Sequence, residues 1–213
     1  MLPRLRDQER VLASYREGVA AISSLAAAFA DQDWSGQTPC TDWEAMDLAG
    51  HLRCMADDYV EWLDEGPDNR LARLMAQAPS AEELARQRAR QNAAELVLLP
   101  RARPAAHIEA FAASADRHVQ RLPELWDEPC FSYAGEEYAV GDHAGVACVE
   151  WHVHAWDLAR SVGLGHRPAD PELLAMAWRT GVPQHPPIDP LAGENDPWEA
   201  VLVACGRLDR ALV

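Results

Sequence analysis

The chain has 213 residues, of which 48% are hydrophobic and 25% are charged. This composition is typical of a globular protein with one domain, with or without a small appendage, and it excludes a disordered chain. The 34 acidic residues outnumber the 19 basic ones, giving a formal net charge of −15. Such a surface repels phosphate backbones and anionic lipids, so we expect neither nucleic acid nor a membrane as partner.

Cysteine spacing and the first residues indicate where the protein works. The five cysteines are scattered without a CxxC pair, which excludes a thiolate zinc site and argues against a disulfide framework. The first residues, MLPRLRD, lack the apolar centre of a secretory signal peptide, and no apolar run is long enough to span a bilayer. We therefore expect a cytoplasmic protein.

Hydrophobic periodicity predicts an all-α protein. Helices are expected over residues 4–30, from 41 or 42 to 65, 80–99, 105–122, 142–163, 171–181 and 197–212. Residues 66–79 are expected to form an irregular crossing with one short helix. A small hairpin is predicted around residues 131–140, where aromatic and polar residues alternate. The prolines at 100 and 104 interrupt one long helix between residues 80–99 and 105–122. The prediction is therefore a bundle of four long helices with a short C-terminal addition.

A narrow polar stripe runs along the helix predicted at 142–163. At about 100° per residue, five polar residues share one face: His143, Glu150, His154, Asp157 and Ser161. Glu150 and His154 lie in the middle of the apolar face, where a buried carboxylate is costly unless a cation or several donors meet it. Their i, i+4 spacing lets both converge on one ion. His152 lies on the far face, where we expect solvent.

His51 lies at the centre of the inward face of the second predicted helix, which starts at residue 41 or 42. Two imidazoles and one carboxylate from two facing helices would leave coordination positions open, which is typical of a catalytic metal site. A buried hydrogen-bonded pair of Glu150 and His154 without metal would give the same pattern. A lone histidine on an apolar face is also more often a core residue than a ligand.

Neighbouring residues are candidates for supporting roles. Three carboxylates could hold the second ring nitrogen of these histidines: Asp47 and Asp58 for His51, and Asp157 for His154. His143, at the end of the stripe, is a candidate proton carrier. The side chains predicted to wall a pocket are Trp62, Trp151 and Met55.

Two segments resemble a known family. Residues 38–43 (TPCTDW) with 47–52 (DLAGHL), and residues 150–159 (EWHVHAWDLA), resemble motifs of the second and fourth helices of the DinB-like metal-binding superfamily. The actinobacterial branch that includes mycothiol-dependent maleylpyruvate isomerase is the most similar. The resemblance implies an up-down-down-up four-helix bundle over residues 1–165, with residues 166–213 forming a short helical extension packed on it.

The resemblance also implies a metal and a thiol. It places the metal ligands on His51, Glu150 and His154, and it implies Zn²⁺, or another divalent metal such as Ni²⁺ or Fe²⁺, with mycothiol as co-substrate. The isomerase binds its thiol with arginines of a substantial second domain, where this chain has a shorter C-terminal part. The arginines that could replace them are Arg160, Arg179 and Arg207.

These features predict a metal-dependent enzyme that is either a thiol S-transferase or an isomerase. The metal would activate a low-molecular-weight thiol, which would attack a small electrophile. We expect a monomer or a homodimer whose partners are the thiol and a small-molecule substrate. Two alternatives remain: a zinc-dependent hydrolase of a small molecule, and a non-catalytic metal-binding or stress-response protein.

Overall fold

The structure is a computed structural model that describes residues 5–40, 42–78, 80–100, 103–133, 135–181 and 196–208. Its elements in chain order are α1 (Gln8–Ala28), η1 (Asp31–Ser35), α2 (Ala45–Glu65), η2 (Gly66–Asp68), α3 (Arg70–Gln77), α4 (Ala81–Leu98), α5 (Pro104–Leu125), β1 (Pro129–Tyr133), β2 (Glu136–Ala139), α6 (Val140–Ser161), α7 (Pro171–Gly181) and α8 (Pro197–Ala204). The all-α fold class predicted from the sequence is confirmed. Over the described ranges, no helix combines the length and the apolar character needed to cross a membrane.

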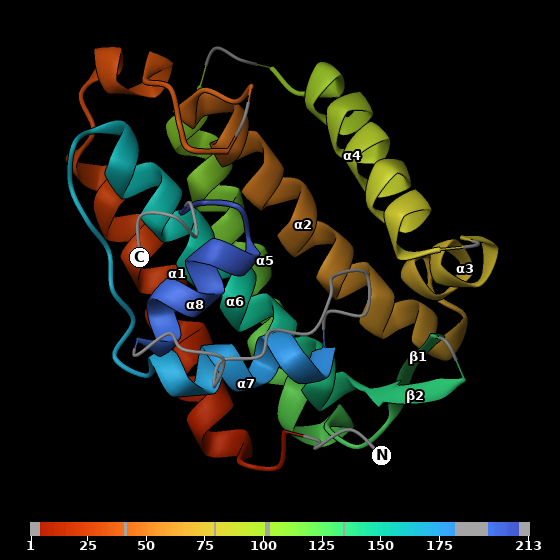
Figure 1. Cartoon of the computed structure of the whole chain (residues 1–213). Coiled ribbons are helices and arrows are strands. Elements are labelled where there is room, and N and C mark those ends of the chain that lie inside the picture. The colour runs from red at the N-terminus through yellow and green to blue at the C-terminus, as the bar shows by residue number, and fades with distance from the viewer. Residues whose placement is uncertain are drawn as a thin grey trace.

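Four helices form the core bundle. α1 packs against α6, α2 packs against α5, and α1 also contacts α5. Figure 1 shows α1 running upward, α2 and α5 downward, and α6 upward again. The two downward helices follow each other because the chain first returns through η2, α3 and α4. The predicted up-down-down-up order is therefore confirmed.

Residues 80–122, predicted as one interrupted helix, form two helices that run in opposite directions. α4 ends at Leu98, α5 begins at Pro104, and the chain reverses between them. Among the described side chains of α4, only Leu84 is buried. A helix with so little apolar surface cannot take a place inside a bundle. α4 therefore lies outside it against α2, and the crossing is longer than the predicted 66–79.

The helix starts depend on short side chains that accept backbone hydrogen bonds. Asp7 accepts from the N–H of Arg10 at 3.1 Å at the start of α1. α2 begins at Ala45, later than the predicted 41 or 42, and Asp47 accepts from the N–H of Glu44 at 3.1 Å. Residue 41, one of the two predicted caps, lies outside the described residues.

The predicted hairpin is confirmed, and the C-terminal helices extend the bundle. β1 and β2 pair antiparallel, with Phe131 opposite Tyr138 and their rings stacked at 4.7 Å between centroids. α7 packs against α6, and α8 packs against α7 (Figure 1). The last predicted helix, 197–212, ends at Ala204. Residues 209–213 lie outside the described part of the chain.

α6 is buried on nearly every side, which the helical wheel could not indicate. His152, predicted to meet solvent, has an exposed fraction of 0%. Its Nε2 lies 3.0 Å from the carbonyl oxygen of Ser14 on α1, and its Nδ1 lies 2.9 Å from Nε2 of His166. The solvent prediction for His152 was wrong because α1 and the segment before α7 cover the far face of α6.

Candidate functional site

The predicted metal ligands form two neighbouring pairs between α2 and α6, His51 with His154 and His154 with Glu150. The rings of His51 and His154 meet edge to face with their centroids 5.2 Å apart. Nε2 of His154 lies 3.5 Å from a carboxylate oxygen of Glu150, one helical turn away. The two histidines are 5% and 4% exposed, while the side chain of Glu150 keeps 31% of its surface exposed. The site is therefore buried on the imidazole side and open on the carboxylate side.

Asp157 fixes the orientation of His154. Nδ1 of His154 lies 3.0 Å from one oxygen of Asp157, which is fully buried. The guanidinium of Arg207 donates two further hydrogen bonds to the same carboxylate, from Nε at 2.8 Å and from Nη2 at 2.9 Å. The predicted role of Asp157 as the partner of His154 thus agrees with the geometry. Arg207, predicted to bind a thiol, has this buried carboxylate as its partner.

The charges in this cluster depend on burial and on hydrogen bonds. Burial, together with the charge of His154, lowers the pKa of His51 well below its usual value, so this ring is neutral at pH 7. Burial acts against the charge on His154 as well, but hydrogen bonds to Asp157 and Glu150 outweigh it and raise the pKa of His154. The pKa of Asp157 is lowered, because the bonds from His154 and Arg207 outweigh its burial.

The chemistry of these donors fits a divalent metal. A metal-bound histidine normally donates its other ring nitrogen to a carboxylate, as His154 is placed to do towards Asp157. Two imidazoles and a carboxylate suit zinc and neighbouring transition metals. Across the described ranges, however, no three His, Cys, Asp or Glu side chains stand close enough together to hold an ion. The metal centre therefore stays a proposal.

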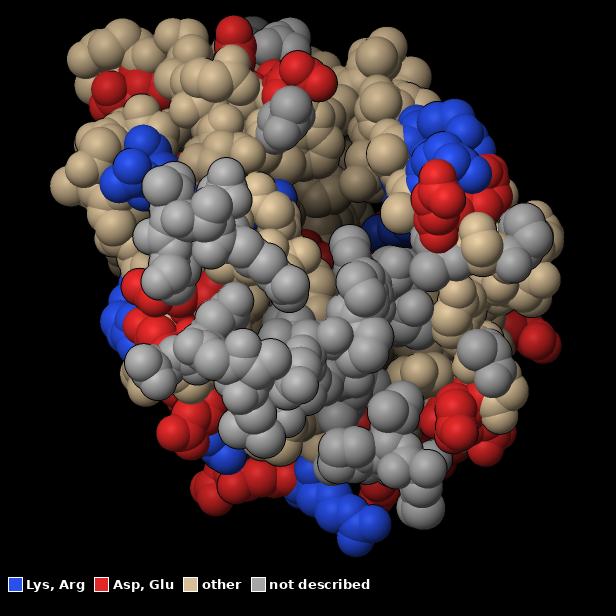
Figure 2. Space-filling view, viewed as in Figure 1, with Lys and Arg blue, Asp and Glu red and all other residues tan. Residues whose placement is uncertain are grey.

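Two cavities meet at Glu150. The first, of about 30 Å³, is lined by Tyr59, Trp62, Leu71, Met75, Arg88, Phe131, His143, Val146 and Glu150. The second, of about 110 Å³, is lined by Val149, Glu150, Val153, Trp178, Cys205 and Arg207. We call them the α4 chamber and the α8 chamber. Figure 2 shows the molecule hollowed between α4 and the bundle, with acidic and basic side chains inside the hollow.

His143 faces the α4 chamber as a neutral ring. It is 5% exposed, and the rings of Tyr59 and Trp62 lie 4.7 and 5.2 Å from it between centroids. Burial, aided by the charge of Arg88, lowers the pKa of His143 to about 4. At neutral pH this ring can donate one hydrogen bond and accept another, which keeps it a candidate proton carrier.

Two of the predicted supporting carboxylates do not reach His51. Asp47 caps the start of α2, and Asp58 pairs with Arg70 of α3. Neither makes a hydrogen bond to His51 in the described structure. The ring packed against His51 is instead that of Trp43, at 4.6 Å between centroids. Both carboxylates share the inward face of α2 with His51. Asp47 has the backbone N–H of Glu44 as its closer partner, and Asp58 has Arg70 of α3.

The pocket and arginine predictions are partly corrected. Trp62 lines the α4 chamber, but the methionine that lines it is Met75 of α3, and Met55 lines neither chamber. Trp151 is also a core residue, with an exposed fraction of 0%. Arg160 is exposed and lies over the ring of Trp156 at 5.8 Å, away from both chambers. The side chain of residue 179 lies outside what the structure describes.

The Asp58 side chain gives a testable pH effect. Burial raises its pKa to about 6, although Arg70 opposes the shift, whereas in the unfolded chain this carboxyl titrates near 3.8. The folded state therefore holds the proton more tightly, and stability is lost as the pH rises through this window. The wild type should lose this stability as the pH rises, and Asp58→Asn should not. We therefore expect the stability of Asp58→Asn relative to the wild type to increase by up to about 3 kcal/mol between pH 4 and pH 7.

Urea unfolding of both proteins at several pH values measures this difference. Asp64→Asn is the control, because Asp64 lies on the same helix with its side chain 65% exposed. Its difference from the wild type is the baseline against which the difference for Asp58→Asn is judged. Parallel curves for Asp58→Asn and the wild type would contradict the raised pKa.

Comparison with known proteins places this fold in a family. Residues 15–159 match the family described as the mycothiol maleylpyruvate isomerase N-terminal domain. The chain belongs to this family. The resemblance that the motifs of the second and fourth long helices indicated is therefore confirmed.

Two solved structures share the fold. The crystal structure of the mycothiol-dependent maleylpyruvate isomerase matches with a TM-score of 0.54 and 15% identity, over 81% of this chain and 68% of that chain. The structure of a histidine-to-alanine mutant of the isomerase matches with a TM-score of 0.53 and 17% identity over the same shares. A comparison with curated proteins gives no match. At these identities the likeness establishes the fold alone.

Proposed function

We propose that the protein is an enzyme that uses a low-molecular-weight thiol to transform a small electrophile at the junction of the two chambers. One observation supports this most strongly. Glu150, one of the three residues to which the family resemblance assigns the metal, lines both chambers, and it contacts His154, which in turn contacts His51. Mycothiol, which the solved relative requires by name, is the proposed thiol.

The proposed ligands of the metal are His51, Glu150 and His154. A divalent metal bound there would lower the pKa of the thiol, so that the nucleophilic thiolate exists at neutral pH. His51 supplies a neutral imidazole, as a ligand must. Asp157 holds the ring of His154 in place through Nδ1, and Arg207 balances the charge of Asp157. Zinc is the proposed metal, with nickel and iron as alternatives.

The proposed reaction is a cis–trans isomerisation with the thiol as catalyst. The thiolate sulfur adds to one carbon of a conjugated double bond, and the electron pair moves to the carbonyl oxygen as an enolate. Rotation about the new single bond follows. The enolate then collapses, re-forms the double bond and expels the thiolate, so that no net oxidation or reduction occurs. The N–H of His143 and the charge of Arg88 face the α4 chamber, where they can stabilise the enolate oxygen.

Removal of the carboxylate ligand tests this proposal. We expect the wild type to bind about one divalent metal per chain and to isomerise maleylpyruvate only when mycothiol is present. Glu150→Ala should lose the metal and at least about a hundredfold in kcat/KM, because the charge stabilisation by a metal is worth several kcal/mol. Elemental analysis and a mycothiol-dependent isomerisation assay measure the two effects.

The control variant is Glu137→Gln, which changes an exposed carboxylate on β2. It should keep both metal and activity. Isomerisation without mycothiol, or hydrolysis of small esters or amides at the same centre, would favour the metal-dependent hydrolase instead. A folded wild-type protein that takes up no zinc, nickel or iron would contradict an enzyme of this kind.

A further inference from the structure

α4 is attached to the rest of the molecule more weakly than any helix of the bundle. Leu84 is its only buried side chain among those described, and Val97 and Leu98 are 84% and 82% exposed. Near its C-terminal end, Leu96 packs over Gly50 of α2, where an added Cβ would come within 3.0 Å of the leucine methyl. Figure 1 shows the helix standing apart from the bundle on the side of α2.

The α4 chamber is too small to take a substrate as it stands. Its volume of about 30 Å³ has room for one or two water molecules, whereas ligand sites usually measure several hundred Å³. Its walls are α2, β1 and α6 on the bundle side, and Leu71 and Met75 of α3 with Arg88 of α4 on the other. α2 and α6 belong to the bundle, so enlarging the chamber on its outer side requires α3 or α4 to move.

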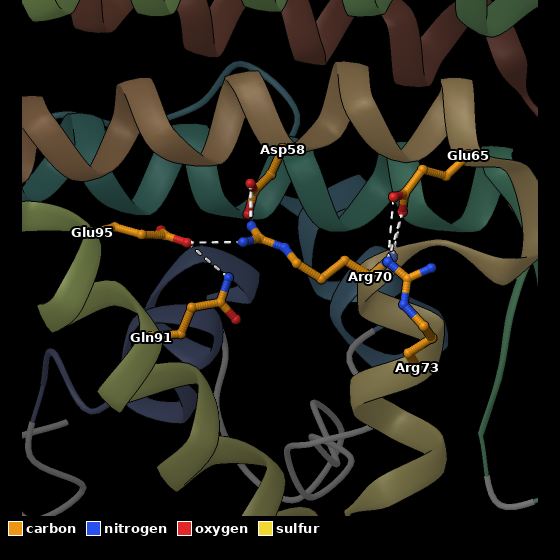
Figure 3. A network of polar contacts seen from close by, with 6 residues as sticks. All are labelled: Asp58, Glu65, Arg70, Arg73, Gln91 and Glu95. Carbon is orange, nitrogen blue, oxygen red and sulfur yellow. Dashed lines mark hydrogen bonds and ion pairs between the residues drawn. The ribbon is translucent and has the colours of Figure 1, made fainter. Parts of the chain in front are cut away.

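One guanidinium joins the outer wall to the bundle. Arg70, at the start of α3, forms an ion pair with Asp58 of α2 and reaches Glu95 of α4, 3.2 Å from Nη1. Glu95 also accepts a hydrogen bond from Gln91 on its own helix at 2.8 Å. Figure 3 shows the Arg70 side chain lying between the carboxylates of Asp58 and Glu95. Arg70 thus links three helices, α2, α3 and α4.

Arg88 is the residue of α4 that lines the chamber, so the link between Arg70 and α4 also affects the chamber. It lies on α4 two turns before Glu95, and its guanidinium is 5.7 Å from the centre of the Trp62 ring. Within the described residues it has no carboxylate partner, so its charge is directed to the chamber. The position of α4 therefore decides both the size of the chamber and the location of its cation.

We propose that α4 is a movable wall of the α4 chamber and that Arg70 is the positioning residue that holds this wall closed through Glu95. A ligand enters when the bond between Arg70 and Glu95 opens and α4 moves away from α2. The return of α4 then brings Arg88 back beside the ligand. This inference rests on the proposed function only for the identity of the ligand, because the motion itself needs no thiol or metal.

Hydrogen exchange of the full chain tests the motion. Glu95→Gln weakens the bond to α4 while it keeps the pair between Arg70 and Asp58. We expect amides of residues 81–98 to exchange about 3 to 10 times faster than in the wild type, while α5 and α6 stay unchanged. Arg70→Gln should give a larger increase, and Arg70→Lys, which keeps the charge without the fork, an intermediate one.

The matched control is Arg73→Gln. Arg73 lies on the same short helix and pairs with Glu65 of α2, but it does not reach α4 (Figure 3). Exchange in residues 81–98 should match the wild type. Equal exchange of α4 in Glu95→Gln and Arg73→Gln, or a uniform increase over all helices, would overturn the proposal. Because this readout needs no substrate, a protein inactive with mycothiol would leave the result for α4 intact.

Discussion

Arg207→Met should lower the free energy of unfolding by about 3–5 kcal/mol. Asp157 is fully buried, and two of its hydrogen bonds come from Arg207, whose side chain is only 16% exposed. The methionine fills a similar volume but donates nothing. It leaves the buried carboxylate with His154 as its remaining charged partner, and breaking a buried pair on one side is much costlier than replacing both partners.

The chain contains a matched control for this experiment. Arg167 makes the same two-pronged contact with Asp196, at 2.7 and 3.0 Å, but its side chain is 56% exposed. Arg167→Met should therefore lower the free energy of unfolding much less than Arg207→Met does. Urea unfolding at pH 7 measures both variants. Equal losses would mean that burial does not set the strength of the pair at Asp157.

A second variant separates the ion pair from simple misfolding. Asp157→Asn in the background of Arg207→Met removes the buried charge, so part of the lost stability should return. The double variant should also bind the proposed metal more weakly, by about 10- to 100-fold, because the amide holds His154 less firmly than the carboxylate does. Stability and metal content would then change in opposite directions, which a general loss of structure cannot produce.

The sequence predicted which side chains share a helix face better than it predicted what those side chains contact. Glu150 and His154 are four positions apart, so they share one face of any α-helix. The position of His51 at the centre of its own inward face follows from the pattern of apolar residues around it. These arguments stay within one helix. They are sound because local geometry alone decides which side chains share a face, and the bundle then brings two inward faces together.

Predictions that needed a neighbouring element were less successful. Asp58 shares the inward face with His51, but Arg70, twelve positions later and on another helix, takes it as its partner. Asp157 has the predicted partner His154, but its second partner, Arg207, lies fifty positions later. A helical wheel states which residues face inward without stating what they meet there. Similarly, the sequence predicted residues 80–99 as the first half of a long helix broken by prolines, whereas α4 has little apolar surface and lies outside the bundle.

Trp151→Ala should cost about 3–5 kcal/mol of stability, the range expected when a large aromatic side chain is removed from a packed core. Its ring contacts those of Tyr15, Tyr59 and Phe111, with centroids 5.9, 5.4 and 4.9 Å away. Gly18 of α1 packs so closely on Trp151 that an added Cβ would lie 2.7 Å from the Cβ of Trp151. The tryptophan therefore fixes the distance between α1 and α6 as well as filling the core.

Trp156→Ala is the control, because Trp156 lies on the same helix but is only half-buried, with its contact to Arg160 at the surface. It should cost about 1 kcal/mol. Trp151 follows Glu150 on α6, so repacking around the alanine shifts the stretch of backbone that carries the proposed metal ligand. We therefore expect Trp151→Ala to weaken metal binding at temperatures where it is still fully folded, and Trp156→Ala to leave it unchanged. Equal metal affinity in the two variants would mean that the core does not position Glu150, and that α2 and the cluster around Asp157 hold the site by themselves.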